Sequence, residues 1–287
     1  MIKENIIIIY HANCPDGFGG AYAAWKKFGK KAAYIPLGYG DPLPPGLKNK
    51  EIYLVDFSLS KSTVMELVEK NRRVTGIDHH ASNENDTKAT QEYSFSLKHS
   101  GAVLAWKYFH PKKAIPIMMK YVEAIDMGKF HGDASAASVL LESYSFDFKV
   151  WDKLREKFDK PAMHKKMLEQ GNAILAYENY LIGTIVQSAQ IVKFEGKKMY
   201  SVQIPKLPIN FKSKIGRALA ETRYGTALLW RETNDGLIAC SLRSKSANIA
   251  KIAQKYGGGG HKLSAGFALN AKKTLPWKIV DSPRKKG

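Results

Sequence analysis

The stretch Arg73-Val74-Thr75-Gly76-Ile77-Asp78-His79-His80 decides the fold, because an apolar run ends abruptly in one carboxylate and two imidazoles. Residues 73–77 have the composition of a buried β-strand. Three consecutive polar groups directly after such a strand are uncommon for structural reasons alone. In a parallel sheet the carboxyl ends of the strands face a ligand crevice. The stretch therefore predicts a strand that delivers chemistry at its end.

Strand and helix patterns alternate on both sides of this stretch. The sequence predicts strands at residues 5–10, 32–37, 51–55 and 73–77, and helices at residues 60–71, 101–109 and 115–126, with a further helical pattern through Ala21, Ala24, Trp25 and Phe28. Ser60 is the expected N-cap of its helix. Residues 82–87 read as a polar loop. This alternation predicts an α/β fold with a parallel sheet.

The pattern changes in the second half of the chain. Residues 136–144, 148–158 and 161–187 read as helices; hairpins follow at 191–204 and 226–242, helices at 213–224 and 248–256, and a closing strand at 265–269. These elements predict a smaller α+β domain after a helical connector. We therefore expect an N-terminal domain at residues 1–134, a connector at 135–188, a C-terminal substrate-binding domain at 189–275 and a basic tail at 276–287.

Composition favours a soluble protein with a polyanionic partner. The chain has 287 residues and a formal net charge of +19, which attracts nucleic acid. No apolar stretch is long enough for a membrane helix, and the run Ile6-Ile7-Ile8-Ile9 is too short for the core of a signal peptide. Cys14 and Cys240 fall in different predicted domains, which argues against a disulfide. We expect a cytoplasmic protein without membrane contact.

Acidic and imidazole side chains gather at the ends of the predicted elements. They are His11, Asp16, Asp56, Asp78, His79, His80 and Asp126. Taken singly, each could be a cap or a structural side chain. Because the carboxyl ends of parallel strands meet at one edge, we expect the groups to converge. Carboxylates with imidazoles suit divalent ions such as Mn²⁺ or Mg²⁺, and a pair of such ions can activate water and neutralise charge on a phosphoryl group.

A second signal lies near the C-terminus. The run Gly257-Gly258-Gly259-Gly260-His261 precedes Ser264-Ala265-Gly266-Phe267, and Arg243 ends the hairpin before it. Glycines let backbone N–H groups approach a ligand closely and form anion-binding concavities. Arg243 offers two parallel donors to a phosphate. A flexible linker would not be followed so soon by an apolar strand, so we interpret the run as a phosphate-binding element.

Together the two signals resemble a known family. Asp78-His79-His80 is similar to the motif that names the DHH phosphoesterases, and the glycine–histidine run with Arg243 resembles the DHH-associated C-terminal domain. That domain occurs in nanoRNases, cyclic-dinucleotide phosphodiesterases and RecJ-type exonucleases. Inorganic pyrophosphatases share the first domain but lack this glycine–histidine motif. The resemblance spans roughly Ile6 to Leu269.

The resemblance implies a role for each of these residues. It makes Asp56 a carboxylate that bridges two metal ions and Asp78 and His80 members of the catalytic machinery. The implied metal ligands are His11, Asp16, Asp56, His79 and Asp126, and the implied substrate-binding residues are Arg243, Gly258, Gly259, Gly260 and His261.

The chain departs from the family pattern at its first motif. Two aspartates, two residues apart, usually follow the histidine, whereas here the first of those positions holds Cys14. Asn13 is nearby but is a weaker, neutral ligand. Both residues are therefore candidate ligands, and the site could hold two ions, one ion, or a softer metal such as zinc.

The resemblance implies a metal-dependent phosphodiesterase or exonuclease that converts short oligonucleotides or single-stranded ends to nucleoside monophosphates. Two alternatives stay open at this point. One is a phosphodiesterase for cyclic dinucleotides or other small phosphoesters, and the other is a single-strand-binding protein with weakened catalysis, which Cys14 suggests. The sequence does not decide whether the substrate is RNA or DNA or from which end a strand is cut. It also does not decide the oligomeric state, for which a homodimer is one option.

Overall fold

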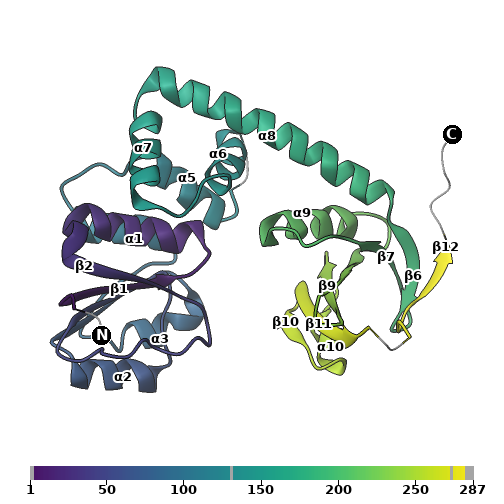
Figure 1. Ribbon diagram of the computed structural model, residues 1–287, viewed down its shortest axis with the longest axis horizontal. Coiled ribbons are helices and arrows are strands. Elements are labelled where there is room, and N and C mark those ends of the chain that lie inside the picture. The colour runs from purple at the N-terminus through teal and green to yellow at the C-terminus, as the bar shows by residue number, and fades with distance from the viewer. Residues whose placement is uncertain (1–2, 130–131, 272–273, 282–287) are drawn as a thin grey trace. The chain divides into compact units, whose positions relative to one another are not determined.

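The chain folds into two compact units that divide after Leu175 (Figure 1). This computed structural model describes residues 3–129, 132–271 and 274–281. Among the described residues, no helix is both long and apolar enough to cross a membrane.

The first unit is built on a five-stranded, wholly parallel sheet. Its strands are β1 (Ile6–His11), β2 (Ala32–Leu37), β3 (Glu51–Val55), β4 (Arg73–Asp78) and β5 (Glu92–Phe95), in the order β2-β1-β3-β4-β5. The first four strands confirm the sequence-based prediction. Strand β5 was not predicted, because it is a short edge strand whose residues are exposed or half-buried and show no apolar run.

Helices lie on both sides of this sheet, and further helices follow it in the chain as far as α8, which continues past Leu175 (Figure 1). They are α1 (Pro15–Phe28), α2 (Lys61–Lys70), α3 (Glu84–Thr87), α4 (Gly101–Phe109), α5 (Ile117–Asp126), α6 (Asp133–Glu142), α7 (Phe148–Phe158) and α8 (Pro161–Gln187), with short 3₁₀ turns at η1 (Gly29–Lys31) and η2 (Ala81–Asn83). Ser60 caps α2 as predicted, its Oγ accepting from the Thr63 N–H at 3.4 Å. The polar loop predicted at residues 82–87 is wrong, because η2 and α3 occupy it.

The sheet is buried on both faces, as a parallel sheet must be. Ile7 and Ile9 belong to a cluster that includes Val64 and Leu67 of α2, whereas Ile8 belongs to a cluster with residues of α1 and α4. Helices α1 and α2 accordingly lie on opposite sides of the sheet in Figure 1. Because β2 and β3 flank β1 on opposite sides, the strand order reverses there, and a ligand crevice is expected at the carboxyl ends of β1 and β3.

A buried polar contact ties α7 to α1. The fully buried Tyr22 donates its hydroxyl to Asp152 Oδ1 at 2.7 Å, and Lys26 Nζ lies 2.9 Å from the same oxygen. Burial alone would raise the pKa of Asp152, but Lys26 and Tyr22 outweigh it and the pKa is lowered. The carboxylate therefore stabilises the folded first unit in its ionised form.

We expect Asp152→Asn to lower the free energy of unfolding by about 1–2 kcal/mol at pH 7. Because the pKa of Asp152 is lower in the folded state, its contribution is complete above the unfolded value of about 4 and is lost as the pH falls through the folded value. Urea unfolding at pH 7 and at pH 3 measures the difference. Glu156→Gln on the same helix, whose side chain is 55% exposed, is the control. An equal loss at both pH values would contradict the prediction.

The second unit contains a seven-stranded mixed sheet. Its strands are β6 (Gln190–Phe194), β7 (Lys197–Gln203), β8 (Thr226–Glu232), β9 (Leu237–Ser244), β10 (Gly259–His261), β11 (Ser264–Asn270) and β12 (Lys278–Asp281), in the order β10-β11-β9-β8-β7-β6-β12. Only β7 and β8 pair in parallel. Helices α9 (Ile209–Ala220) and α10 (Ala250–Lys255) lie on opposite faces of this sheet (Figure 1). The fold class predicted from the sequence is thus confirmed.

Two predictions for this unit need correction. The helix predicted at residues 213–224 begins at Ile209 and ends at Ala220, because Pro208 provides the N-cap. The strand at residues 265–269 does not close the domain: Lys278–Asp281 form β12, inside the range predicted to be a basic tail. The remaining tail residues, 282–287, lie outside the described part of the chain. The predicted boundaries at 134, 188 and 275 stay predictions.

Candidate metal centre

The acidic and imidazole residues predicted to converge do meet at one edge of the first sheet. His11 ends β1, Asp56 directly follows β3, and Asp78 ends β4, with His79 and His80 after it. These three strands are neighbours in the sheet. Asp16 joins them from the first turn of α1, and Asp126 joins from the end of α5.

His79 and Asp56 form the middle of this cluster. The His79 Nε2 atom lies 3.3 Å from Asp56 Oδ1, 3.6 Å from Asp16 Oδ2 and 3.3 Å from Asp126 Oδ2. On the other side, His11 Nδ1 lies 3.5 Å from Asp56 Oδ2. The two oxygens of Asp56 therefore face imidazoles on two different sides, His79 on one and His11 on the other.

The donors fit a divalent cation. Asp16 and Asp56 are each only 1% exposed, yet both Asp56 oxygens and His79 Nε2 have no hydrogen-bond partner among the described residues. Leaving a buried charge without a partner is costly, so such atoms normally pair with a counter-charge or a metal. Three groups of donors each lie within 4.8 Å: His11 with Cys14 and Asp56; Asp16 with His79 and Asp126; and Asp56 with Asp78, His79 and His80. Carboxylate and imidazole donors suit Mn²⁺ and Mg²⁺.

The pKa values reflect the crowding of carboxylates. Burial, together with Asp56 and Asp126, raises the pKa of Asp16 well above its usual range. Burial would also raise the pKa of Asp56, but the contacts with His11 and His79 outweigh this effect and hold the Asp56 pKa at about 2. Burial lowers the pKa of His79, whereas Asp56 and Asp126 raise it more, so the net shift is upward. The raised pKa values of Asp16 and His79 mean that both groups hold a proton more tightly than usual, which lessens the repulsion among the carboxylates.

We expect the affinity for Mn²⁺ to rise as the pH increases from about 6 to 8. An ion must displace the protons that the raised pKa values of Asp16 and His79 retain, so binding releases protons and is favoured when protons are scarce. Calorimetric titration with Mn²⁺ in two buffers of different ionisation enthalpy, at three pH values, measures both the affinity and the proton release. An affinity that is independent of pH, with no proton release, would contradict this prediction.

The N-terminus of α4 positions the two buried aspartates. The Asp16 carboxylate accepts from the N–H groups of Gly101, at 2.7 Å, and Ala102, at 3.0 Å. Ser100 caps the helix through its side chain. Asp56 has a left-handed backbone, with φ of 62°, and its own N–H donates to the Ile77 carbonyl at 2.8 Å. A Cβ on Gly101 would lie 2.6 Å from Asp56 Cβ and 2.7 Å from Asp56 Oδ1.

We therefore expect Gly101→Ala to lower metal-dependent turnover by about 100-fold, because a displacement of about 1 Å at a catalytic group is enough for such a loss. Gly183→Ala is the matched control: this glycine is also helical, but a Cβ there meets nothing within 4 Å. The control should leave activity unchanged and stabilise its helix by about 0.5–1 kcal/mol. Steady-state rates and thermal melts of both variants test the prediction, which fails if the two variants behave alike.

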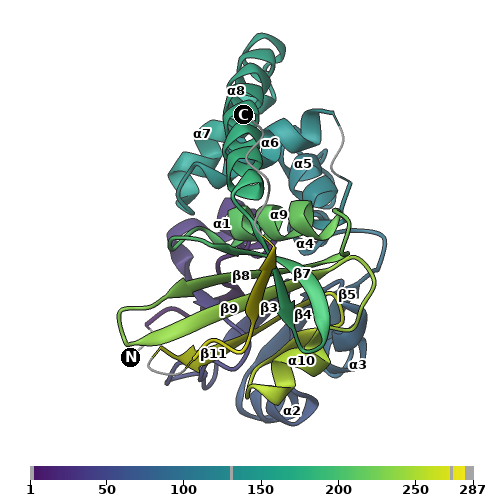
Figure 2. The same ribbon diagram turned by 90° about the vertical axis from the view of Figure 1, so that its right-hand side faces the viewer.

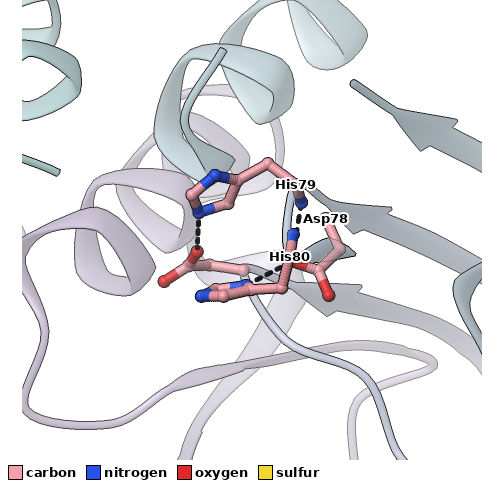
Figure 3. A group of neighbouring side chains, drawn as sticks. Asp78, His79 and His80 are labelled. Carbon is pink, nitrogen blue, oxygen red and sulfur yellow. Dashed lines mark hydrogen bonds and ion pairs between the residues drawn. The ribbon is translucent and has the colours of Figure 1, made fainter. Parts of the chain in front are cut away.

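The Asp78 side chain contacts His80 and the backbone beside it (Figure 3). Its Oδ1 accepts from the N–H groups of His79, at 2.7 Å, and His80, at 3.2 Å, and lies 2.7 Å from His80 Nδ1. Its Oδ2 accepts from Asn83 Nδ2 at 2.9 Å. The contact with Asp78 raises the pKa of His80, which favours its protonated form. Asp78 is thus placed to orient His80.

Sequence reasoning missed four residues at this site. Asn83, Ser100 and Gly101 make the contacts given above, and Tyr39 lies over His11, with ring centroids 5.4 Å apart. Tyr39 is 58% exposed, and its hydroxyl accepts from Asn83 at 3.1 Å. The pair Ser100-Gly101 before an apolar helix is a recognisable N-cap signal, but nothing in the sequence indicates Tyr39.

Cys14 lies between β1 and α1, at the position where the resemblance to the DHH phosphoesterases leads one to expect an aspartate. Its sulfur belongs to the donor group with His11 and Asp56. Burial, followed by the charge of Asp56, raises the pKa of the Cys14 thiol to about 12, so the thiol is neutral when no metal is bound. Asn13 occupies the turn after β1 in a left-handed conformation, with φ of 55°.

In the second unit, the predicted phosphate-binding residues lie on three adjacent strands. His261 of β10 pairs with Ser264 of β11, which pairs with Arg243 of β9. The Arg243 guanidinium is anchored by Ser213 Oγ, at 3.0 Å, and by the Leu242 carbonyl, at 2.9 Å. These contacts pre-orient the guanidinium.

Only the first two glycines before His261, Gly257 and Gly258, belong to the connection after α10. Gly259 and Gly260 belong to strand β10, and a Cβ on Gly258 or Gly260 would collide with β11, at 2.1 Å from the Gly266 carbonyl oxygen and 2.6 Å from Ala265 Cα respectively. A Cβ on Gly259 would meet nothing within 4 Å. Close packing therefore explains Gly258 and Gly260, whereas Gly257 and Gly259 are beside open space, and Gly257 has a positive φ of 74°.

A curated protein is similar to this chain over nearly its whole length. No protein-family model matches the chain. Uncharacterized protein R106 of Acanthamoeba polyphaga mimivirus is 25% identical over 305 residues, which cover 96% of this chain and 70% of the relative.

Solved structures match over nearly the whole chain. The DHH domain of a member of the s1p family of ribosomal proteins is 13% identical, with a TM-score of 0.56 and coverage of 94% of this chain and 84% of that one. The pGpG-specific phosphodiesterase PggH from Vibrio cholerae is 12% identical, with a TM-score of 0.52 and coverage of 93% and 94%. The exonuclease RecJ bound to manganese is 15% identical, with a TM-score of 0.52 and coverage of 92% and 86%. The chain thus has the fold of the DHH phosphoesterases.

Proposed function

We propose that the protein is a metal-dependent phosphodiesterase that hydrolyses short oligonucleotides, or single-stranded ends, to nucleoside monophosphates. The observation that carries the proposal is the buried Asp56 carboxylate, whose two oxygens accept no hydrogen bond from a described residue and face His79 on one side and His11 on the other. The ligands that we infer for the divalent ions are His11, Asp16, Asp56, His79 and Asp126.

Bound divalent ions would supply Lewis acidity and an acidic water molecule. The chain's own residues orient the substrate and move the proton. Asp78 keeps His80 oriented and favours its protonated form, so His80 can donate a hydrogen bond to a phosphoryl oxygen or a proton to the leaving oxygen. The N-terminus of α4 fixes Asp16, which keeps the neighbouring carboxylates in place.

The second unit would bind the end of the substrate. Arg243, with its guanidinium already oriented by Ser213, offers donors to a terminal phosphate, and His261 lies two strands away on the same face. Gly259 is beside open space, where a base or ribose could approach the backbone. The net charge of +19 favours polymeric over mononucleotide substrates.

The relatives support the same class of reaction. One is an exonuclease bound to manganese and another is a phosphodiesterase specific for pGpG, a linear dinucleotide. Linear substrates are therefore favoured over cyclic ones. The second candidate, a binding protein with weakened catalysis, is supported by Cys14, whose neutral thiol is a poor ligand for Mn²⁺.

A substrate panel tests the proposal. The purified protein with Mn²⁺ is incubated with linear di- to pentanucleotides of RNA and DNA and with a cyclic dinucleotide, and products are separated by chromatography. We expect nucleoside monophosphates from the linear substrates, at least tenfold faster than from the cyclic one, and none from the Asp56→Ala variant. Turnover that is equal in Asp56→Ala, or absent from all linear substrates, would end the proposal.

A further inference from the structure

A row of cationic side chains lies on one face of the second sheet. Arg243 of β9 pairs with Ala227 of β8, and Arg231 of β8 pairs with Ala239 of β9. Directly paired residues project from the same face of a sheet, and so do alternate residues along a strand. Arg231 and Arg243 are therefore on the same face, four residues apart along β9, or about 14 Å. Figure 2 shows β8, β9 and β11 side by side.

Helix α9 brings further cations to this face. A Cβ on Gly216 would lie 2.6 Å from Arg243 Cγ, and Ser213 accepts from Arg243 at 3.0 Å, so the helix packs directly on the arginine. Lys212 precedes Ser213. Lys212 is half-buried, and burial, followed by the charges of Arg243 and Arg231, lowers its pKa.

Within the described ranges, no ion pair neutralises this row. Three other basic residues of the second unit form ion pairs: Lys214 with Glu178, Lys245 with Glu221, and Lys255 with Glu195. No such ion pair involves Lys212, Arg217, Arg231 or Arg243 within residues 3–129, 132–271 and 274–281. The Asp235 carboxylate accepts a hydrogen bond from the Thr233 hydroxyl. This bond, with a smaller contribution from the charge of Arg231, lowers the pKa of Asp235. Clustered cations repel one another, so the row is suited to an anion with several charges.

The sheet surface beside this row is formed by small, partly exposed residues. Ser241 of β9 and Gly266 of β11 are paired, and both are half-buried. Ser264 continues this surface toward His261 on β10. Arg243 therefore stands between the His261 end of the face and the end that holds Arg231. The number of cations and the length of the row exceed what one phosphate group can contact.

We propose that Lys212 and Arg231 form a further phosphate subsite, which binds the next phosphates of a single strand whose terminal phosphate is held at Arg243 and His261. This inference rests on the proposed function and specifies its substrate class. It makes tri- to pentanucleotides better ligands than dinucleotides, because only the longer strands carry phosphates that reach the added subsite.

Binding of labelled strands to the full-length protein tests the inference. Fluorescence anisotropy is measured with a dinucleotide and a pentanucleotide of the same sequence, both 5′-phosphorylated, in EDTA so that no hydrolysis occurs. The variants are Lys212→Gln and Arg231→Gln, and the control is Lys251→Gln on α10, which packs on the opposite face. For each variant we expect the pentanucleotide Kd to rise about tenfold and the slope of log K against log salt to fall in magnitude by about 0.7, the value for one phosphate contact on a single strand.

The dinucleotide Kd should stay within a factor of two in both variants, and the control should change neither ligand. An equal loss for both lengths, or no loss for the pentanucleotide, would overturn the added subsite even if hydrolysis is normal. Conversely, a pentanucleotide preference that depends on Lys212 and Arg231, in a protein that hydrolyses no strand with Mn²⁺, would keep the subsite and refute the proposed enzymatic function.

Discussion

Asp56→Asn should reduce Mn²⁺-supported hydrolysis by about 10³-fold or more. Its carboxylate faces both groups of donors, so the substitution weakens the binding of each ion, and each ion's stabilisation of the transition state is worth several kcal/mol. Asparagine has nearly the same shape and tolerates the left-handed backbone at this position, so the fold should be retained.

Thermal stability provides a second readout. Without metal, the substitution removes a carboxylate whose ionised form is stabilised by His11 and His79, so we expect the melting temperature to fall by a few degrees. With Mn²⁺, the native protein should gain stability and the variant should not. Glu66→Gln, an exposed carboxylate on α2, is the control and should behave like the native protein. Undiminished stabilisation of Asp56→Asn by Mn²⁺ would contradict the metal centre.

The second large effect is expected at Cys14. Its thiol is neutral without metal because burial and Asp56 raise its pKa to about 12. A soft ion such as Zn²⁺ or Cd²⁺ can displace that proton, whereas Mn²⁺ prefers oxygen donors. We expect Cys14→Asp to raise the Mn²⁺ affinity of the donor group that contains His11 by about 100-fold, to increase Mn²⁺-dependent turnover by at least about tenfold, and to lower the affinity for Cd²⁺.

Metal content and a spectroscopic signal measure this exchange. Cd²⁺ bound to a thiolate absorbs in the ultraviolet, so the native protein should show that band and both Cys14→Asp and the control Cys14→Ala should lose it. Only Cys14→Asp should gain Mn²⁺ affinity. If Cys14→Ala binds Cd²⁺ as tightly as the native protein, the thiol is not a ligand. Robust Mn²⁺ turnover in the unaltered protein, unchanged in Cys14→Asp, would exclude the binding-protein alternative.

The first sheet and its chemistry could be predicted because the signals are local. Three of the apolar strands run directly into a polar residue, as Val55 into Asp56 and Ile77 into Asp78, and the parallel topology then brings those ends together. Tyr39 could not be found in this way. Its place over His11 depends on how the segment between β2 and β3 folds back, and the sequence of that segment carries no periodic signal.

The glycine run shows a different limit. Consecutive glycines lack side-chain periodicity, so Gly259 and Gly260 give no strand signal, although they pair with Gly266 and Ala265 of β11. Their strand conformation is fixed by that neighbour, which lies later in the chain. Strand β12 escaped prediction for a similar reason, because it pairs with β6, far earlier in the sequence.

The left-handed backbone at Asp56 bears on how this lineage can change. Aspartate, asparagine and glycine are the residues that adopt such a conformation most readily, so either of the other two can replace Asp56 without straining the backbone. On the proposed function, one such substitution would stop hydrolysis and leave a folded chain that keeps its cationic sheet face.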